Sequence, residues 1–89
     1  MDISIIVPLY NEDESIPELF SWIKRVMTEN GFTYEVIFVD DGSTDNSWAI
    51  IENLQNENSN VKGIKFRRNY GKSPALFCGF KMAQGDYVV

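Results

Sequence analysis

Short segments of strand length, separated by longer segments with helical periodicity, decide what this chain can fold into. Ile3–Val7 and Tyr34–Val39 are mostly apolar runs, Val61–Phe66 is expected to form a third strand, and a fourth strand begins at Asp86. Runs of this length are typical of strands that are covered on both faces. Strands that alternate with helices pair in parallel through right-handed crossovers. We therefore expect an α/β fold with three layers, α/β/α, in which a mostly parallel sheet lies between helices.

Local signals mark the first expected helix. Ser15 and Glu18 have the spacing of a capping box, and Pro17 stands where a first helical turn tolerates proline. Gly31 is expected to end this helix. Its apolar side chains recur at helical spacing and are Leu19, Phe20, Ile23, Val26 and Met27.

Two further helices follow the second and third runs. One is expected over about residues 46–57, with Ser43 or Asp45 as its cap. The other begins with Ser73 as its cap, followed by Pro74. The side chains that the middle helix is expected to bury are Ala49, Ile50 and Leu54.

The unusual polar residues of the chain lie in three loops, PLYNEDES, DDGSTD and RRNYGKS, which follow the first three strands. In open parallel sheets, ligands bind beyond the carboxyl ends of the strands. These loops therefore form the candidate binding site.

The DDGSTD loop places two carboxylates directly after a buried strand. Asp40 and Asp41 are suited to accept hydrogen bonds from a nucleoside base or a ribose hydroxyl. The alternative is local, because Asp, Gly, Ser and Thr also form turns and caps. We favour the ligand role for Asp40 and the turn-forming role for Asp45.

The other two loops complete a possible nucleotide site. Pro8 fixes the exit from the first strand, Tyr10 offers a ring on which a base can stack, and Asn11 and Glu12 supply hydrogen-bonding groups. A solvated approach to the helix is the alternative for this loop. In the third loop, the cationic residues suited to a pyrophosphate are Arg67, Arg68 and Lys72, and a solvated basic surface is the alternative.

Composition limits the classes of partner. The net charge of −5 argues against general nucleic-acid binding, although the segment from Asn58 to Gln84 contains basic residues and no acid. Cys78 is the only cysteine, which excludes an internal disulfide and favours a reducing, cytoplasmic setting. The amino terminus lacks the apolar stretch of a signal peptide or a membrane span.

Three ordered motifs carry a resemblance to a known family. ISIIVPLYNEDESI, EVIFVDDGSTDNS and FRRNYGKSPALFCGFKMAQGDYVV resemble the amino-terminal part of the nucleotide-binding region of family 2 glycosyltransferases, which have the GT-A fold. The RRNYGKS version looks most like the branch that transfers a hexose to a polyprenyl or dolichyl phosphate. The resemblance implies a Rossmann-like, partial GT-A fold that stops in the fourth strand. Residues 1–89 would then be a single domain, the donor-nucleotide-binding half of a catalytic domain.

The resemblance also implies an activity and roles for residues. The activity is transfer of a hexose from a UDP- or GDP-sugar to a polyprenyl phosphate or a cell-envelope polysaccharide. Asp40 would read the base edge, and Asp41 would shape its loop or touch the ribose. The donor-binding residues implied in all are Pro8, Tyr10, Asn11, Glu12, Asp40, Asp41, Arg68 and Lys72.

The family's DxD metal-binding motif follows the strand that opens with GDYVV, and the sequence ends at Val89. We therefore expect a divalent metal, Mg or Mn, in the full-length enzyme but no metal ligand and no catalytic residue in this chain. The 89 residues alone are expected to be inactive, and the parent enzyme to lie at the cytoplasmic face of a membrane. The alternatives are a non-catalytic nucleotide-binding module and an interaction module that self-associates through an exposed edge strand.

Overall fold

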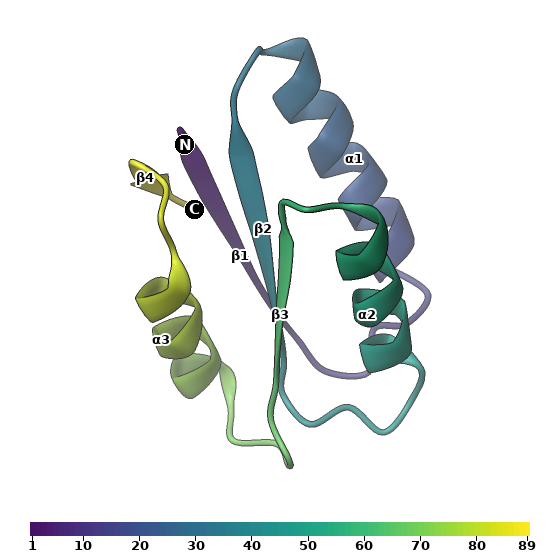
Figure 1. The fold of residues 1–89 in the computed structure, drawn as a ribbon. Helices are drawn as coiled ribbons and strands as arrows, with labels where there is room; N and C mark the ends of the chain where they lie inside the picture. Colours follow the sequence, from purple (N-terminus) through teal and green to yellow (C-terminus); the bar gives the residue numbers. More distant parts are fainter.

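Four parallel strands form a single sheet in the order β3-β2-β1-β4 (Figure 1), in a computed structural model that describes residues 1–89. Three helices connect them. The elements in chain order are β1 (Ile3–Leu9), α1 (Ile16–Glu29), β2 (Tyr34–Asp40), α2 (Ser47–Glu57), β3 (Val61–Lys65), α3 (Lys72–Met82) and β4 (Tyr87–Val88).

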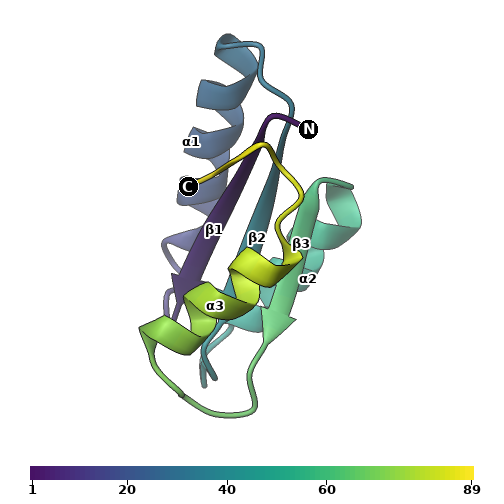
Figure 2. The ribbon, with the colours of Figure 1, turned by 90° about the vertical axis from the view of Figure 1, so that its left-hand side faces the viewer.

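The helices cover both faces of the sheet. Figures 1 and 2 show α1 and α2 on one face and α3 on the other. The chain builds β1, β2 and β3 side by side, and α3 then carries it back to the far side of β1, where β4 joins. Because right-handed crossovers in opposite directions place their helices on opposite faces, this reversal accounts for the position of α3. The predicted three-layer α/β/α fold with a parallel sheet is confirmed.

The core consists of two layers that share the central strand. Val36 and Phe38 pack with α1 and α2, whereas Ile37 and Val39 pack with α3. All four side chains are fully buried, as a strand covered on both faces requires. The continuous apolar run of β2 thus supplies one residue after another to alternate faces of the sheet.

Small residues let α3 lie close to the sheet. Ala75 and Gly79 are the buried residues of this helix. A Cβ atom at Gly79 would lie 2.4 Å from Cγ2 of Ile6, so a larger residue there would push α3 away from β1. The apolar side chains on the outer face of α3, Phe77 and Phe80, are exposed.

The structure corrects three details of the expected helices. Ser15 makes no cap bond to the amides of α1 and instead donates its hydroxyl to Glu12, so the predicted capping box is wrong. Ser73 lies inside α3, whose cap is Gly71, a residue with no side chain to offer. In α2 the fully buried apolar residue is Ile51, whereas Ile50 and Leu54 are half-buried and Ala49 is exposed.

The strands extend further than expected at the end where the polar loops begin. β1 continues through Pro8 to Leu9, and β2 includes Asp40. β4 is a short edge strand whose Tyr87 and Val88 side chains are exposed. That this edge pairs with a second chain stays a prediction. No helix combines the length and apolar character that a membrane crossing needs.

Candidate functional site

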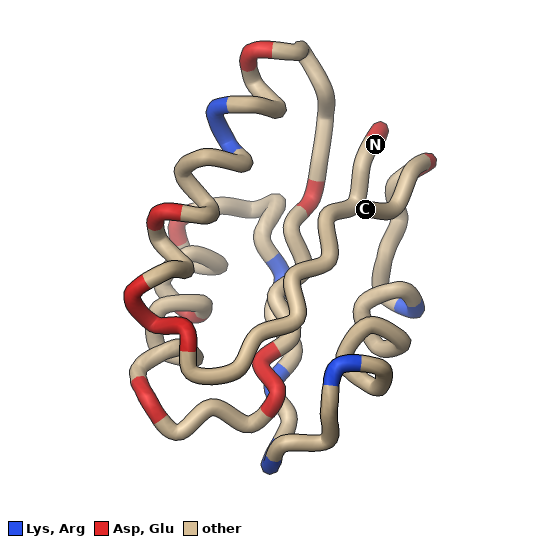
Figure 3. Tube along the Cα trace, turned by 180° about the vertical axis from the view of Figure 1, so that it is seen from behind, with Lys and Arg blue, Asp and Glu red and all other residues tan.

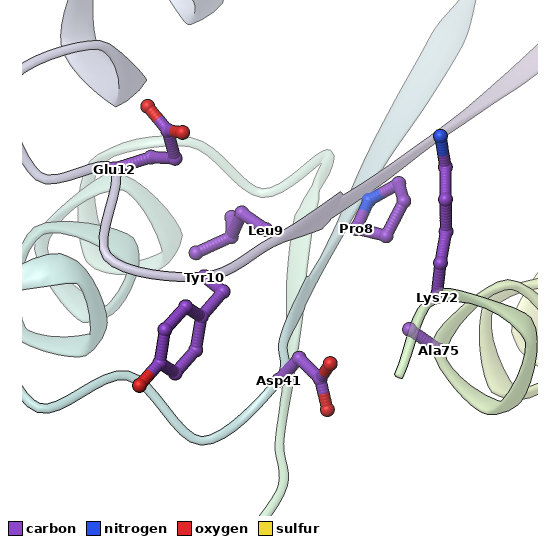
Figure 4. A pocket seen from close by; sticks show the side chains of 7 residues that line it. All are labelled: Pro8, Leu9, Tyr10, Glu12, Asp41, Lys72 and Ala75. Carbon is purple, nitrogen blue, oxygen red and sulfur yellow. The ribbon is translucent and has the colours of Figure 1, made fainter. Parts of the chain in front are cut away.

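A cavity of about 310 Å³ lies at the carboxyl ends of β1 and β2, beside the start of α3 (Figure 4). Its walls come from three separate parts of the chain: the end of β1 with the loop after it, the loop after β2, and the first turn of α3. The lining residues are Pro8, Leu9, Tyr10, Glu12, Asp41, Lys72 and Ala75. The position agrees with the rule that ligands of open α/β sheets bind beyond the strand carboxyl ends.

The loops after β1 and β2 are tied together by Asn11. Its side-chain oxygen accepts hydrogen bonds from the amides of Thr44, at 2.8 Å, and Asp45, at 3.3 Å. Its own amide donates to the hydroxyl of Ser43 at 2.8 Å. Asn11 has a φ of +52°, a left-handed conformation that asparagine adopts more readily than most residues. The structure therefore shows Asn11 fastening the site rather than lining the cavity.

Asp40 is completely buried at the end of β2. Its Oδ1 accepts a hydrogen bond from the amide of Ser43 at 2.8 Å, which forms the turn. Its Oδ2 is buried and has no hydrogen-bond partner. A buried carboxylate oxygen without a partner is costly, but a ligand in the cavity does not reach this atom, because Asp40 is fully buried and lies outside the cavity lining.

Asp41 fixes the loop before α3. One of its oxygens accepts from the amide of Tyr70 at 2.7 Å and the other from the amide of Gly71 at 2.9 Å. Gly71 has a φ of +106°, which strongly favours glycine, and it is the residue that caps α3. The carboxylate of Asp41 thereby sets the place where α3 begins.

The first turn of α3 brings positive charge to the cavity. Lys72 is its first residue, and Figure 4 shows the Lys72 side chain extending past the ring of Pro8. The first amides of a helix have no partner within it and attract anions. Figure 3 shows both acidic and basic residues along α1, acidic residues in the loops before α1 and α2, and only basic ones along α3.

Arg68 lies apart from the cavity lining. Its guanidinium carbon lies 5.1 Å from the centre of the Tyr70 ring, a cation–π contact on the exposed loop. Tyr70 also meets Phe66 edge to face, with 5.6 Å between ring centres. These contacts order the loop that Asp41 holds.

Asp45 has the turn-forming role that the sequence favours. Its Oδ1 accepts from the amide of Ser47 at 2.9 Å, at the start of α2, and its Oδ2 accepts from the amide of Asp13 at 3.3 Å. Desolvation raises the pKa of Asp45, but hydrogen bonds from Ser47 and from the Asp13 amide outweigh it and leave the pKa below its usual value. The residue that caps α2 is Asn46, which makes no side-chain cap bond, so the predicted caps Ser43 and Asp45 are wrong, although Asp45 accepts from the amide of the first helical residue.

The residues of this chain do not form a site for the divalent metal that the resemblance implies. No group of three or more Asp, Glu or Cys side chains converges. Asp41, the carboxylate nearest the first turn of α3 in the cavity, has both oxygens engaged by backbone amides.

Five of the eight residues predicted to bind a donor line the cavity together, and they are Pro8, Tyr10, Glu12, Asp41 and Lys72. Asn11, Asp40 and Arg68 lie outside its lining. Leu9 and Ala75 line it and were not predicted. Their signal was weak, since an apolar residue at a strand end and a small residue in a first helical turn are common in any fold.

Comparisons with known proteins extend this picture. The profile of the family described as Glycosyl transferase family 2 matches residues 4–89. The undecaprenyl-phosphate 4-deoxy-4-formamido-L-arabinose transferase of Pseudomonas fluorescens (strain SBW25) is 42% identical over 88 residues, which are 98% of this chain and 26% of that protein. The chain thus spans about a quarter of the length of this relative.

Solved structures share the fold. Residues 1–349 of S. aureus TarS in complex with UDP-GlcNAc match with a TM-score of 0.83 and 32% identity, over 100% of this chain and 25% of that one. The mannosyltransferase PcManGT from Pyrobaculum calidifontis, in complex with GDP-Man and Mn²⁺, matches with a TM-score of 0.79 and 26% identity, over 97% of this chain and 25% of that one. The chain belongs to glycosyl transferase family 2, a family of enzymes with the GT-A fold.

Proposed function

We propose that the cavity binds the nucleoside diphosphate part of a nucleotide-sugar donor. The observation that carries this proposal is the convergence of Tyr10, Glu12, Asp41 and Lys72, from two loops and the first turn of α3, on one cavity at the strand carboxyl ends. Its volume of about 310 Å³ is at the small end of the range for ligand sites, enough for part of a donor.

Each part of the donor has a matching group. The exposed ring of Tyr10 offers a stacking surface for the base. The Oδ2 of Asp40 is buried without a partner and would accept a hydrogen bond from the base edge once the loop after β2 moves. Lys72 and the first amides of α3 would hold the diphosphate. Arg68 would approach the phosphates by movement of its exposed side chain.

The whole protein would be a glycosyltransferase that moves a hexose from a UDP- or GDP-sugar to a polyprenyl phosphate, or to a cell-envelope polysaccharide. The relative from P. fluorescens, which is named for undecaprenyl phosphate, supports a lipid phosphate, whereas the arabinose in its name is a pentose and does not support a hexose. An enzyme with such an acceptor would work at the cytoplasmic face of a membrane. The 89 residues would form its donor-binding part and, by themselves, bind nucleotide without transferring sugar.

Replacing Lys72 by methionine tests the diphosphate role. We expect the variant to bind UDP or GDP about tenfold more weakly than the wild type, because a charge-assisted hydrogen bond to phosphate is lost. Isothermal titration calorimetry measures the affinity. Lys24→Met is the matched control, since Lys24 is an exposed lysine of α1 outside the cavity. Equal affinities for both variants, or no nucleotide binding by the wild type, would contradict the proposal.

A further inference from the structure

A buried carboxylate lies at the other end of the sheet from the cavity. Glu35 is the second residue of β2 and its side chain is completely buried. Glutamate is almost never fully buried unless it is paired, because removing a carboxylate from water is costly. The partners of the Glu35 carboxylate therefore indicate its role in the fold.

The partners of Glu35 come from both neighbouring strands and from the connection between α3 and β4. Its Oε2 accepts from the hydroxyl of Ser4 on β1, at 2.5 Å, and from the amide of Gln84, at 2.7 Å. Its Oε1 forms an ion pair of 2.6 Å with Lys62 on β3. The hydroxyl oxygen of Ser4 in turn accepts from the amide of Gly85 at 2.7 Å. One carboxylate thus joins three strands to the connection between α3 and β4.

β4 is held by backbone hydrogen bonds and buries neither of its side chains, and Tyr87 is 73% exposed. The amides of Asp86, Tyr87 and Val89 donate to the carbonyl oxygens of Met1 at 3.2 Å, Asp2 at 3.0 Å and Ser4 at 2.8 Å, and the carbonyl oxygen of Val89 accepts from the amide of Ile6 at 2.9 Å. Segments with few buried apolar contacts open readily, so hydrogen bonds made by the connection before β4 add to the stability of this edge.

The connection also passes very close to β1. A Cβ atom at Gly85 would lie 2.6 Å from the backbone nitrogen of Ser4. Glycine therefore allows the approach, and the bonds from Gln84 and Gly85 to Glu35 and Ser4 hold it. Figure 1 shows α3 running from the cavity end of the sheet to this opposite end, where β4 begins.

We propose that Glu35 is a latch, which holds the connection after α3 against β1 and thereby fixes where β4 joins the sheet. The latch has a counterpart at the other end of α3, where Asp41 binds the amides of Tyr70 and Gly71. Carboxylates from the two ends of the β2 segment thus anchor both ends of the helix whose first residue lines the cavity.

Amide hydrogen exchange, followed residue by residue by NMR, tests the latch. In Glu35→Gln, which keeps the size of the side chain and removes its charge, we expect the amides of Gln84, Gly85, Tyr87 and Val89 to exchange about tenfold faster relative to the core amides of β2. The amides of Tyr70 and Gly71, held by Asp41, should keep their rates relative to that core. Glu52→Gln, at an exposed position on α2, is the matched control and should change neither group.

Acceleration of all amides by one common factor would overturn the proposal, because Glu35 would then support only the stability of the whole fold. Unchanged rates from Gln84 to Val89 would overturn it as well. Should Glu35→Gln fail to fold, Ser4→Ala gives the answer, since it leaves the ion pair with Lys62 in place and removes the acceptor of the Gly85 amide. In Ser4→Ala we expect the amide of Gly85 to exchange faster than in the wild type. An unchanged rate at Gly85 would contradict the proposal.

Discussion

Replacing Gly42 by alanine is expected to lower the free energy of unfolding by about 2–4 kcal/mol. Gly42 has a φ of +80°, in the left-handed region that disfavours a side chain. An added Cβ would also lie 2.3 Å from the carbonyl carbon of Arg68 and 2.6 Å from the backbone nitrogen of Asn69. These are backbone atoms of the loop that Asp41 holds, so no side-chain rotation can relieve the contact.

Chemical denaturation with urea measures this loss. Gly31→Ala is the matched control, because Gly31 has a similar φ of +70° but no atom within 4 Å of its added Cβ. That variant isolates the conformational cost, about 1 kcal/mol. Equal losses in the two variants would mean that the loops after β2 and β3 do not pack as closely as the structure shows.

Replacing Glu35 by alanine is expected to cost about 2–4 kcal/mol of unfolding free energy. The change leaves the amide of Gln84 without its acceptor and Lys62 without its ion-pair partner. Lys62 is 30% exposed, so water can solvate its ammonium group, and the loss stays below that of a fully buried pair. Urea denaturation measures the effect, and Glu52→Ala on the exposed side of α2 is the control. A loss no larger than that of the control would show that the carboxylate contributes nothing to stability.

The carboxylate of Glu35 also makes the free energy of unfolding depend on pH. Burial raises the pKa of Glu35, but the hydrogen bonds from Lys62, Ser4 and Gln84 outweigh it and hold the pKa below its usual value. A carboxyl group whose pKa is lower in the folded state stabilises the fold above its unfolded pKa of about 4.3, and this contribution disappears as the pH falls through the folded pKa. Glu35→Gln should therefore show a smaller loss of stability than the wild type between neutral and acidic pH. If the unfolding free energies of the two proteins changed in parallel with pH, this expectation would be contradicted.

The sequence predicted the central strand because Val36 to Val39 are four consecutive apolar residues, and a strand covered on both faces buries all of them. The sequence did not predict which side of α2 faces the sheet. Trp48 to Ile51 are four consecutive apolar residues, so helical periodicity alone does not say which of them faces the sheet. The cap of α3 was missed for a different reason. Asp41 binds the amide of Gly71, the helix begins at Lys72, and Ser73 therefore lies inside the helix instead of capping it.

The cavity was predictable in place and only partly in detail. The rule for strand carboxyl ends located Tyr10, Asp41 and Lys72 together, since it depends only on the order of elements. The bonds from Asn11 to the loop after β2 join residues more than 30 positions apart, and no local pattern reveals them. Glu35 gave no signal either, because one of its partners is a backbone amide 49 residues away.

Titration of the isotope-labelled chain with UDP and then GDP, followed by NMR, tests the central claim that this cavity binds a nucleoside diphosphate. Each nucleotide would be added with and without manganese. We expect selective movement of amide signals in residues 8–12, 40–43 and 67–73, with one base producing the larger saturable change. A well-dispersed spectrum in which neither nucleotide moves these signals would contradict it.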